Sequence, residues 1–108
     1  MKNIKNYLDY LKIGIKKLDL LKLQRIEDII FKKIRENKKI FVCGNGGSAS
    51  VANHFLCDFN KGIKLSSKRK LKPKIFSLSD NMETVLAVAN DISFNKIFSF
   101  QLDNYYTN

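Results

Sequence analysis

Three glycines, an asparagine and a serine follow an apolar segment and form the run Gly44–Ser48. Glycine backbones can adopt positive φ and approach a ligand closely. Ser48 is placed to be the N-cap of a helix that begins just after the run. The N-terminus of a helix carries a partial positive charge, which suits an anionic or polyhydroxylated ligand. The sequence therefore predicts a ligand-binding turn between a strand and a helix.

His54 and Asp58 are four residues apart on the helix expected after this turn. Both side chains should therefore project from one helical face. A carboxylate can act as a general base when it lies near a substrate carbon, and a histidine and a carboxylate one turn apart can share a metal ion. Each residue could instead be an ordinary solvated helix residue. Together with the glycine-rich turn, the pair indicates an active site.

Apolar periodicity predicts two helices before the turn. The first carries a narrow apolar seam at steps of four and three, which suits packing against another helix, including one from a second subunit. The seam consists of Ile4, Leu8, Leu11, Ile15 and Leu18. After a bend at 20–23, a second helix should run to about Asn37 with Leu23, Ile26, Ile30 and Ile34 on its buried face. We expect this helical pair, residues 1–37, to pack on a sheet or on other subunits.

Strands and helices should alternate over residues 38–108, which we expect to be part of one domain. We predict strands at 39–43, with Cys43 buried at its end, and at 74–78, joined by the motif helix and a polar loop over Lys61–Pro73. A helix over 82–89 should end at Asn90-Asp91, and Ser93 should cap a last helix over 94–104. This order predicts an α/β fold with a parallel sheet. Ligands of such sheets bind at the carboxyl ends of strands, where Gly44–Ser48 and Ser79-Asp80 fall.

The composition is typical of a soluble globular chain, with 44% apolar and 28% charged residues. The net charge of +10 comes mainly from lysines spread along the chain, so we interpret it as a solvated surface and expect no nucleic-acid partner. The basic stretch Lys61–Lys74 could draw in a phosphorylated substrate. No apolar run is long enough for a bilayer and no signal-peptide core is present, so we expect a cytoplasmic protein without a membrane partner. Cys43 and Cys57 fit free thiols.

The run Val42–Ala49, followed by Ala52-Asn53-His54-Phe55, resembles the signature of the SIS (sugar isomerase) domain family. Within that family it is most similar to the bacterial phosphoheptose isomerases. The stretches 77–81, 87–91 and 94–99 keep the family's order and spacing. The resemblance implies a three-layer, flavodoxin-like fold and homotetramers. It also implies isomerisation of sedoheptulose 7-phosphate to glycero-manno-heptose 7-phosphate, which supplies heptose for surface polysaccharide.

The resemblance also implies roles for individual positions. The substrate contacts would be Asn45, Gly46, Gly47, Ser48, Asp58, Asn90 and Asp91. One zinc ion per site would be held by His54 and Asp58, and Asp58 would be the catalytic base. The family usually has Glu at this last position, and the shorter Asp would place its carboxylate about 1 Å away. That departure favours an alternative, a non-catalytic SIS module that binds a phosphosugar or a protein partner.

Relatives in this family continue beyond the position that matches Asn108. Their further elements include a Ser/Thr-rich phosphate loop and a second zinc-binding His with a Gln. His54 is the only histidine of this chain. We therefore expect the chain to be the N-terminal part of a longer protein or a truncated product, and to be inactive alone.

Overall fold

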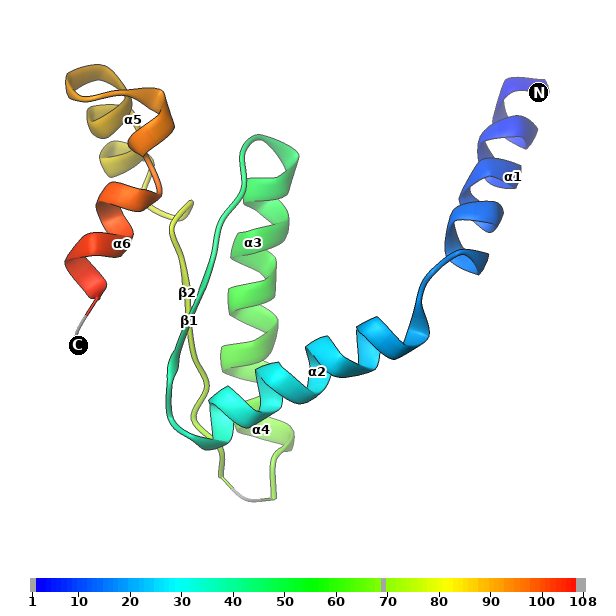
Figure 1. The fold of residues 1–108 in the computed structure, drawn as a ribbon, viewed down its shortest axis with the longest axis horizontal. Helices are drawn as coiled ribbons and strands as arrows, with labels where there is room; N and C mark the ends of the chain where they lie inside the picture. The colour runs from blue at the N-terminus through cyan, green and yellow to red at the C-terminus, as the bar shows by residue number, and fades with distance from the viewer. Residues whose placement is uncertain (1, 69, 107–108) are drawn as a thin grey trace. The chain divides into compact units, whose positions relative to one another are not determined.

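The structure of the chain, a computed structural model, describes residues 2–68 and 70–106 (Figure 1). The residues divide into two compact units, Met1–Lys32 and Lys33–Asn108. In the described parts of the chain, no helix is both long enough and apolar enough to cross a membrane.

The first unit holds helix α1, Lys2–Lys16, and most of helix α2, Leu20–Arg35. The bend between them lies before Leu20 and not over 20–23 as expected. Asp19 explains the shift, because its Oδ1 accepts a hydrogen bond from the backbone N–H of Lys22 at 3.1 Å. A carboxylate in this position caps the first turn of a helix and fixes where the helix begins.

The apolar faces of α1 and α2 are largely uncovered. The five seam residues are all exposed, at 66% for Ile4, 47% for Leu8, 49% for Leu11, 59% for Ile15 and 51% for Leu18. The expected burial of Leu23 and Ile26 is wrong, since they are 45% and 53% exposed. Ile34 alone of the predicted face is buried. It lies in the last turn of α2, which belongs to the second unit.

Asn37 ends α2, as the sequence predicts. It takes the left-handed conformation with φ of 57°. The Asn37 N–H donates to the Ile34 carbonyl at 3.0 Å, and the Lys38 N–H donates to the Lys33 carbonyl at 2.9 Å. These two bonds form a Schellman motif, which satisfies helix carbonyls that would otherwise lack partners. The chain then enters the first strand directly.

Strands β1, Lys39–Val42, and β2, Lys74–Ser77, form a parallel pair. Both lie within a residue of their predicted bounds. The register pairs Lys39 with Lys74 and Val42 with Ser77, so both strands end at the same edge. The α/β class with a parallel sheet and a helical N-terminus is therefore confirmed. Alternate residues of β2 are buried, and Cys43, expected to be buried after β1, is exposed.

Helix α3, Gly47–Cys57, runs alongside the two strands (Figure 1). It passes without a break into a π-helical turn η1, Asp58–Ile63, and then into α4, Lys64–Ser66. The expected loop over Lys61–Pro73 is therefore wrong for its first six residues. Asn60 holds this extension on the sheet by hydrogen bonds to both backbone groups of Ile75. The helical extension is thus attached to the sheet at Asn60, a contact across the fold that local sequence does not show.

Helix α5, Met82–Asp91, is followed by the short 3₁₀ turn η2, Phe94–Lys96, and by α6, Ser99–Tyr105. Asn81 caps α5 by accepting the Thr84 N–H at 2.7 Å. Asn90 and Asp91 form the last turn of α5 and do not break it as expected. The expected last helix is split in two, and the Ser93 side chain makes no capping bond.

The buried apolar residues lie in the second unit. They are Ile34, Ala52, Ile75, Leu78, Val88 and Ile97. Of the aromatic residues toward the C-terminus, Phe94 and Tyr106 are 60% and 73% exposed. Tyr105 instead covers the sheet, with its ring centre 5.5 Å from that of Phe41.

Candidate functional site

The glycine-rich turn between β1 and α3 needs glycine at two positions for different reasons. At Gly44, a Cβ would lie 2.4 Å from the backbone C and O of Ser48, so only glycine lets the strand end pass the helix start. At Gly46, φ is 54° and ψ is −125°, a conformation that other residues rarely adopt. A tight turn therefore joins the strand to the helix, and its binding of a ligand stays a prediction.

Gly46, and not Ser48, is the N-cap of α3. Because Gly46 has positive φ, the helix begins at Gly47, and Ser48 lies inside the first turn. The Ser48 N–H donates to the Asn45 carbonyl at 3.0 Å, and the Ala49 N–H donates to the Gly46 carbonyl at 3.0 Å. These two amides are therefore occupied within the turn. The side chains of Asn45 and Ser48 are exposed to a ligand.

Ser79, two residues beyond β2, holds the start of this turn. Its Oγ accepts the Gly44 N–H at 3.0 Å and donates to the Gly44 carbonyl at 2.8 Å. The last ladder bond before it runs from the Leu78 N–H to the Val42 carbonyl at 2.9 Å. The hydroxyl thus continues the pairing of the two strands by one more step. The turn and the end of β2 meet at the carboxyl edge, as expected from a parallel sheet.

Asn53 of α3 joins the same group of residues, and the sequence analysis assigned it no role. The Ser77 hydroxyl donates to Asn53 Oδ1 at 2.6 Å and accepts the Ser79 N–H at 3.1 Å. Asn53 Nδ2 lies 3.5 Å from the Ser79 carbonyl. Ser77 and Ser79 are only 5% and 8% exposed. The sequence shows a Ser-x-Ser at the end of the second predicted strand, but its partner Asn53 lies on α3, 24 residues before Ser77, so no local pattern joins the two.

His54 and Asp58 face each other, as their spacing predicts. His54 Nδ1 lies 3.9 Å from Asp58 Oδ1, and the two side chains are 77% and 61% exposed. At 1.5 Å of rise per residue, His54 lies about 10 Å along the axis from the start of α3. Side chains in a helix lean toward its N-terminus, so both groups lean toward the glycine turn. The pair is accessible to a ligand that lies along α3.

Two of the ligands for a catalytic zinc ion are available in this pair. Two atoms bound to a tetrahedral zinc are separated by about 3.3 Å, so exposed side chains 3.9 Å apart reach that geometry with a small rotation. A catalytic zinc takes three protein ligands. Within residues 2–68 and 70–106, no group of three His, Cys, Asp or Glu side chains could hold a metal. The described residues therefore fit part of a zinc site.

Asn90 and Asp91, the predicted site residues on α5, are hydrogen-bonded to each other. Asn90 Nδ2 donates to Asp91 Oδ1 at 2.8 Å on the surface of α5. Within the described part of the chain, no hydrogen bond or ion pair joins them to the glycine turn or to His54. The basic stretch Lys61–Lys74 begins on η1 and ends on β2, and its Arg69 lies outside the described residues.

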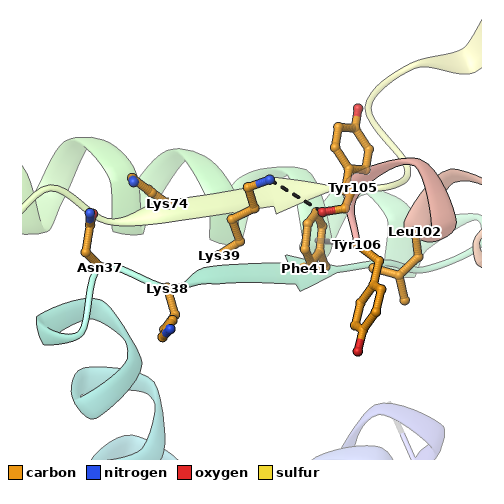
Figure 2. A pocket seen from close by; sticks show the side chains of 8 residues that line it. All are labelled: Asn37, Lys38, Lys39, Phe41, Lys74, Leu102, Tyr105 and Tyr106. Atoms are coloured by element: carbon orange, nitrogen blue, oxygen red, sulfur yellow. Dashed lines mark hydrogen bonds between the residues drawn. The ribbon is translucent and has the colours of Figure 1, made fainter. Parts of the chain in front are cut away.

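A cavity of about 410 Å³ lies at the opposite, amino end of the strands (Figure 2). Three lysines and three aromatic rings contribute to it, and Lys39 Nζ donates to the Tyr105 carbonyl at 3.4 Å. It is lined by Asn37, Lys38, Lys39, Phe41, Lys74, Leu102, Tyr105 and Tyr106. None of these side chains is a carboxylate or a histidine. The cavity therefore lacks the carboxylate and the histidine on which the predicted chemistry depends, and the carboxyl edge remains the candidate site.

Comparisons with known proteins show the family of the chain. Residues 5–107 match the SIS domain, and the chain belongs to the SIS domain family. It is 32% identical over 83 residues to a phosphoheptose isomerase from Clostridium acetobutylicum, an alignment that covers 77% of this chain and 41% of that protein. A phosphoheptose isomerase from Shewanella denitrificans is 35% identical over 80 residues, covering 74% of this chain and 39% of that one.

The fold also matches a solved structure, that of phosphoheptose isomerase GmhA from Neisseria gonorrhoeae. The TM-score is 0.70 at 24% sequence identity, and the match covers 95% of this chain and 51% of that one. At this identity the likeness concerns the fold. The chain spans about two fifths of the length of the two relatives above.

Proposed function

We propose that this chain forms part of a phosphosugar aldose–ketose isomerase that acts on sedoheptulose 7-phosphate and makes glycero-manno-heptose 7-phosphate for surface polysaccharide. The observation that carries the proposal is the accessible His54–Asp58 pair, 3.9 Å apart on the helix that begins in the glycine turn. Membership of the SIS family and similarity to phosphoheptose isomerases support the substrate class.

The chain's own residues would divide the work between holding the sugar and moving a proton. Asn45 and Ser48 present exposed side chains, which can hydrogen-bond sugar hydroxyls together with the backbones of Gly46 and Gly47. Asp58, which is exposed, would take a proton from C1 of the ketose and return it to C2, while the hydroxyl proton passes from O1 to O2 and the carbonyl from C2 to C1. Asn90 and Asp91 would contact the substrate from α5.

Zinc is part of the proposal, with His54 and Asp58 as two of its ligands. When bound, the ion would polarise the sugar oxygens and stabilise negative charge on them. The remaining ligand would come from outside the described residues or from a neighbouring subunit. We also propose that the assembled protein is a homotetramer, which the exposed seam of α1 supports.

The test is turnover of sedoheptulose 7-phosphate by the protein as its source produces it, with and without added zinc. Asp58→Asn removes the base and should lower kcat by roughly 100-fold or more. Asp103→Asn, an equivalent change at an exposed position on α6, should have no effect. Absence of turnover in the unaltered protein under both conditions would refute the assignment of this substrate.

A second candidate is a non-catalytic SIS module that binds a phosphosugar or a protein partner. The observation that favours it is Asp58, which is one methylene shorter than the Glu usual in these isomerases and would leave the carboxylate about 1 Å short. The two candidates differ in hydrogen exchange. A binding module would show affinity for the phosphosugar, measured by calorimetry, with no incorporation of solvent deuterium at C1 or C2.

A further inference from the structure

We infer that Ser79 is a positioning residue, which fixes the glycine turn of the proposed active site through Gly44. The inference rests on the proposed function for its catalytic consequence, but its structural part stands on hydrogen bonds alone. Among the described residues, Ser79 makes no hydrogen bond to a proposed substrate contact. Its hydroxyl instead bonds both the N–H and the carbonyl of Gly44, at 3.0 and 2.8 Å.

The Gly44 backbone depends on the Ser79 hydroxyl because position 44 cannot carry a side chain that would hold the turn by packing. A Cβ at Gly44 would collide with Ser48, so the turn is held by hydrogen bonds to bare backbone. The ladder between β1 and β2 has ended by this point, at the Leu78-to-Val42 bond. A hydroxyl can accept and donate at the same time. Ser79 therefore occupies both polar groups of Gly44 with one side chain.

Ser79 is itself fixed from the side of α3. Its N–H donates to Ser77 Oγ at 3.1 Å, and Ser77 Oγ donates to Asn53 Oδ1 at 2.6 Å. Asn53 directly precedes His54 on α3. The glycine turn and the part of α3 that carries His54 are thus both held by hydrogen bonds to residues at the end of β2, Ser79 and Ser77. Buried networks in which each group has its partners are rigid, and this one sets the separation between the turn and the proposed base.

Removing the hydroxyl should release the turn without removing any proposed catalytic group. In Ser79→Ala, we expect exchange of the Gly44 amide hydrogen, followed by NMR, to become roughly tenfold faster. A displacement near 1 Å at an active site can lower rates about 100-fold, so kcat/KM for sedoheptulose 7-phosphate should fall by about that factor. Ser79→Thr keeps the hydroxyl and should restore both quantities toward those of the unaltered protein.

Two controls separate positioning from general loss of stability. Ser66→Ala removes a hydroxyl that bonds the Gly62 carbonyl at 2.8 Å on the exposed α4, and it should change neither quantity. Ile97→Val trims a buried side chain that is 2% exposed and lowers stability, with no effect expected on Gly44 exchange or on turnover. All variants are made in the protein as its source produces it.

The inference is overturned if Gly44 exchange in Ser79→Ala equals that of the unaltered protein, or if Ile97→Val loses as much activity as Ser79→Ala. The inference is also overturned if the unaltered protein is active and Ser79→Ala has the same turnover. If the unaltered protein has no turnover, the proposed function fails. The exchange of Gly44 then still decides whether Ser79 holds the turn.

Discussion

The side-chain amide of Asn60 pairs with both backbone groups of Ile75, as a neighbouring strand would. Asn60 Oδ1 accepts the Ile75 N–H at 3.1 Å, and Asn60 Nδ2 donates to the Ile75 carbonyl at 2.9 Å. Ile75 is 1% exposed, and its side chain is the most deeply buried in the described chain. The π-helical turn η1 that carries Asn60 is therefore part of the sheet's pairing and not a loose extension of α3.

Asn60→Leu should destabilise the fold, because the Ile75 N–H and carbonyl would lose their partners beside the core. The expected cost is about 1–3 kcal/mol, measured as a lower urea midpoint. Asn60→Asp should cost a similar amount, since an oxygen would then face the Ile75 carbonyl. The matched control is Asn95→Leu at an exposed position on η2. Equal midpoints for the variants at 60 and 95 would contradict the pairing.

Both strands were predictable to within a residue because each is a short apolar run between polar boundaries. The end of α2 at Asn37 was predictable for a similar local reason, since asparagine tolerates the left-handed conformation found there. The spacing of His54 and Asp58 also predicted their shared face correctly. In each of these cases the determining interactions lie within a few residues of one another.

The features that the sequence predicted wrongly depend on contacts between residues distant in sequence or on backbone angles. The polar segment that begins at Lys61 is helical because Asn60 bonds to Ile75, a contact 15 residues away. Ser48 was predicted to be the N-cap because serine is a common capping residue. Gly46, with its positive φ, is the N-cap instead, so the helix begins earlier. The role of Asn53 depends on a partner 24 residues away, Ser77, so no local pattern could assign it.

Gly44→Ala should destabilise the junction of β1 and α3, because the new Cβ would lie 2.4 Å from Ser48 backbone atoms that cannot yield easily. Overpacking of this kind costs about 1–3 kcal/mol, which a urea titration resolves. Gly62→Ala is the matched control, since a Cβ there has no atom within 4 Å. A midpoint for Gly44→Ala as high as that for Gly62→Ala would show that the turn can open to admit a side chain.

His54→Ala should weaken zinc binding at least about tenfold. Loss of a residue that only hydrogen-bonds to a metal ligand already lowers metal affinity about 10- to 100-fold. The measurement is competition with a chromophoric chelator, using the protein as its source produces it after removal of bound metal. His54→Gln is the second variant, since it keeps a polar side chain of similar size. Affinity unchanged in both variants would exclude His54 as a ligand, whatever the activity of the protein.

The exposed seam of α1 predicts self-association through this helix. Tyr7, Tyr10, Leu11, Gly14, Ile15 and Leu18 line a groove of about 380 Å³ on its surface. Gly14 opens the groove because it adds no side chain there, and a Cβ at that position would meet no atom within 4 Å. Exposed apolar patches of this kind mark interaction surfaces. We expect the groove to receive an apolar side chain of another subunit.

Leu11→Asp with Ile15→Asp should disrupt this contact. Burial of a Leu or Ile side chain contributes about 1.5–3 kcal/mol, so losing two should raise the dissociation constant by more than about 100-fold. Sedimentation velocity over a range of concentrations measures it. Asn3→Asp with Asn6→Asp adds the same charge to exposed positions of the same helix and should leave assembly intact. If both double variants dissociate alike, charge and not the apolar seam governs association. If both assemble like the unaltered protein, the groove on α1 is not an interface.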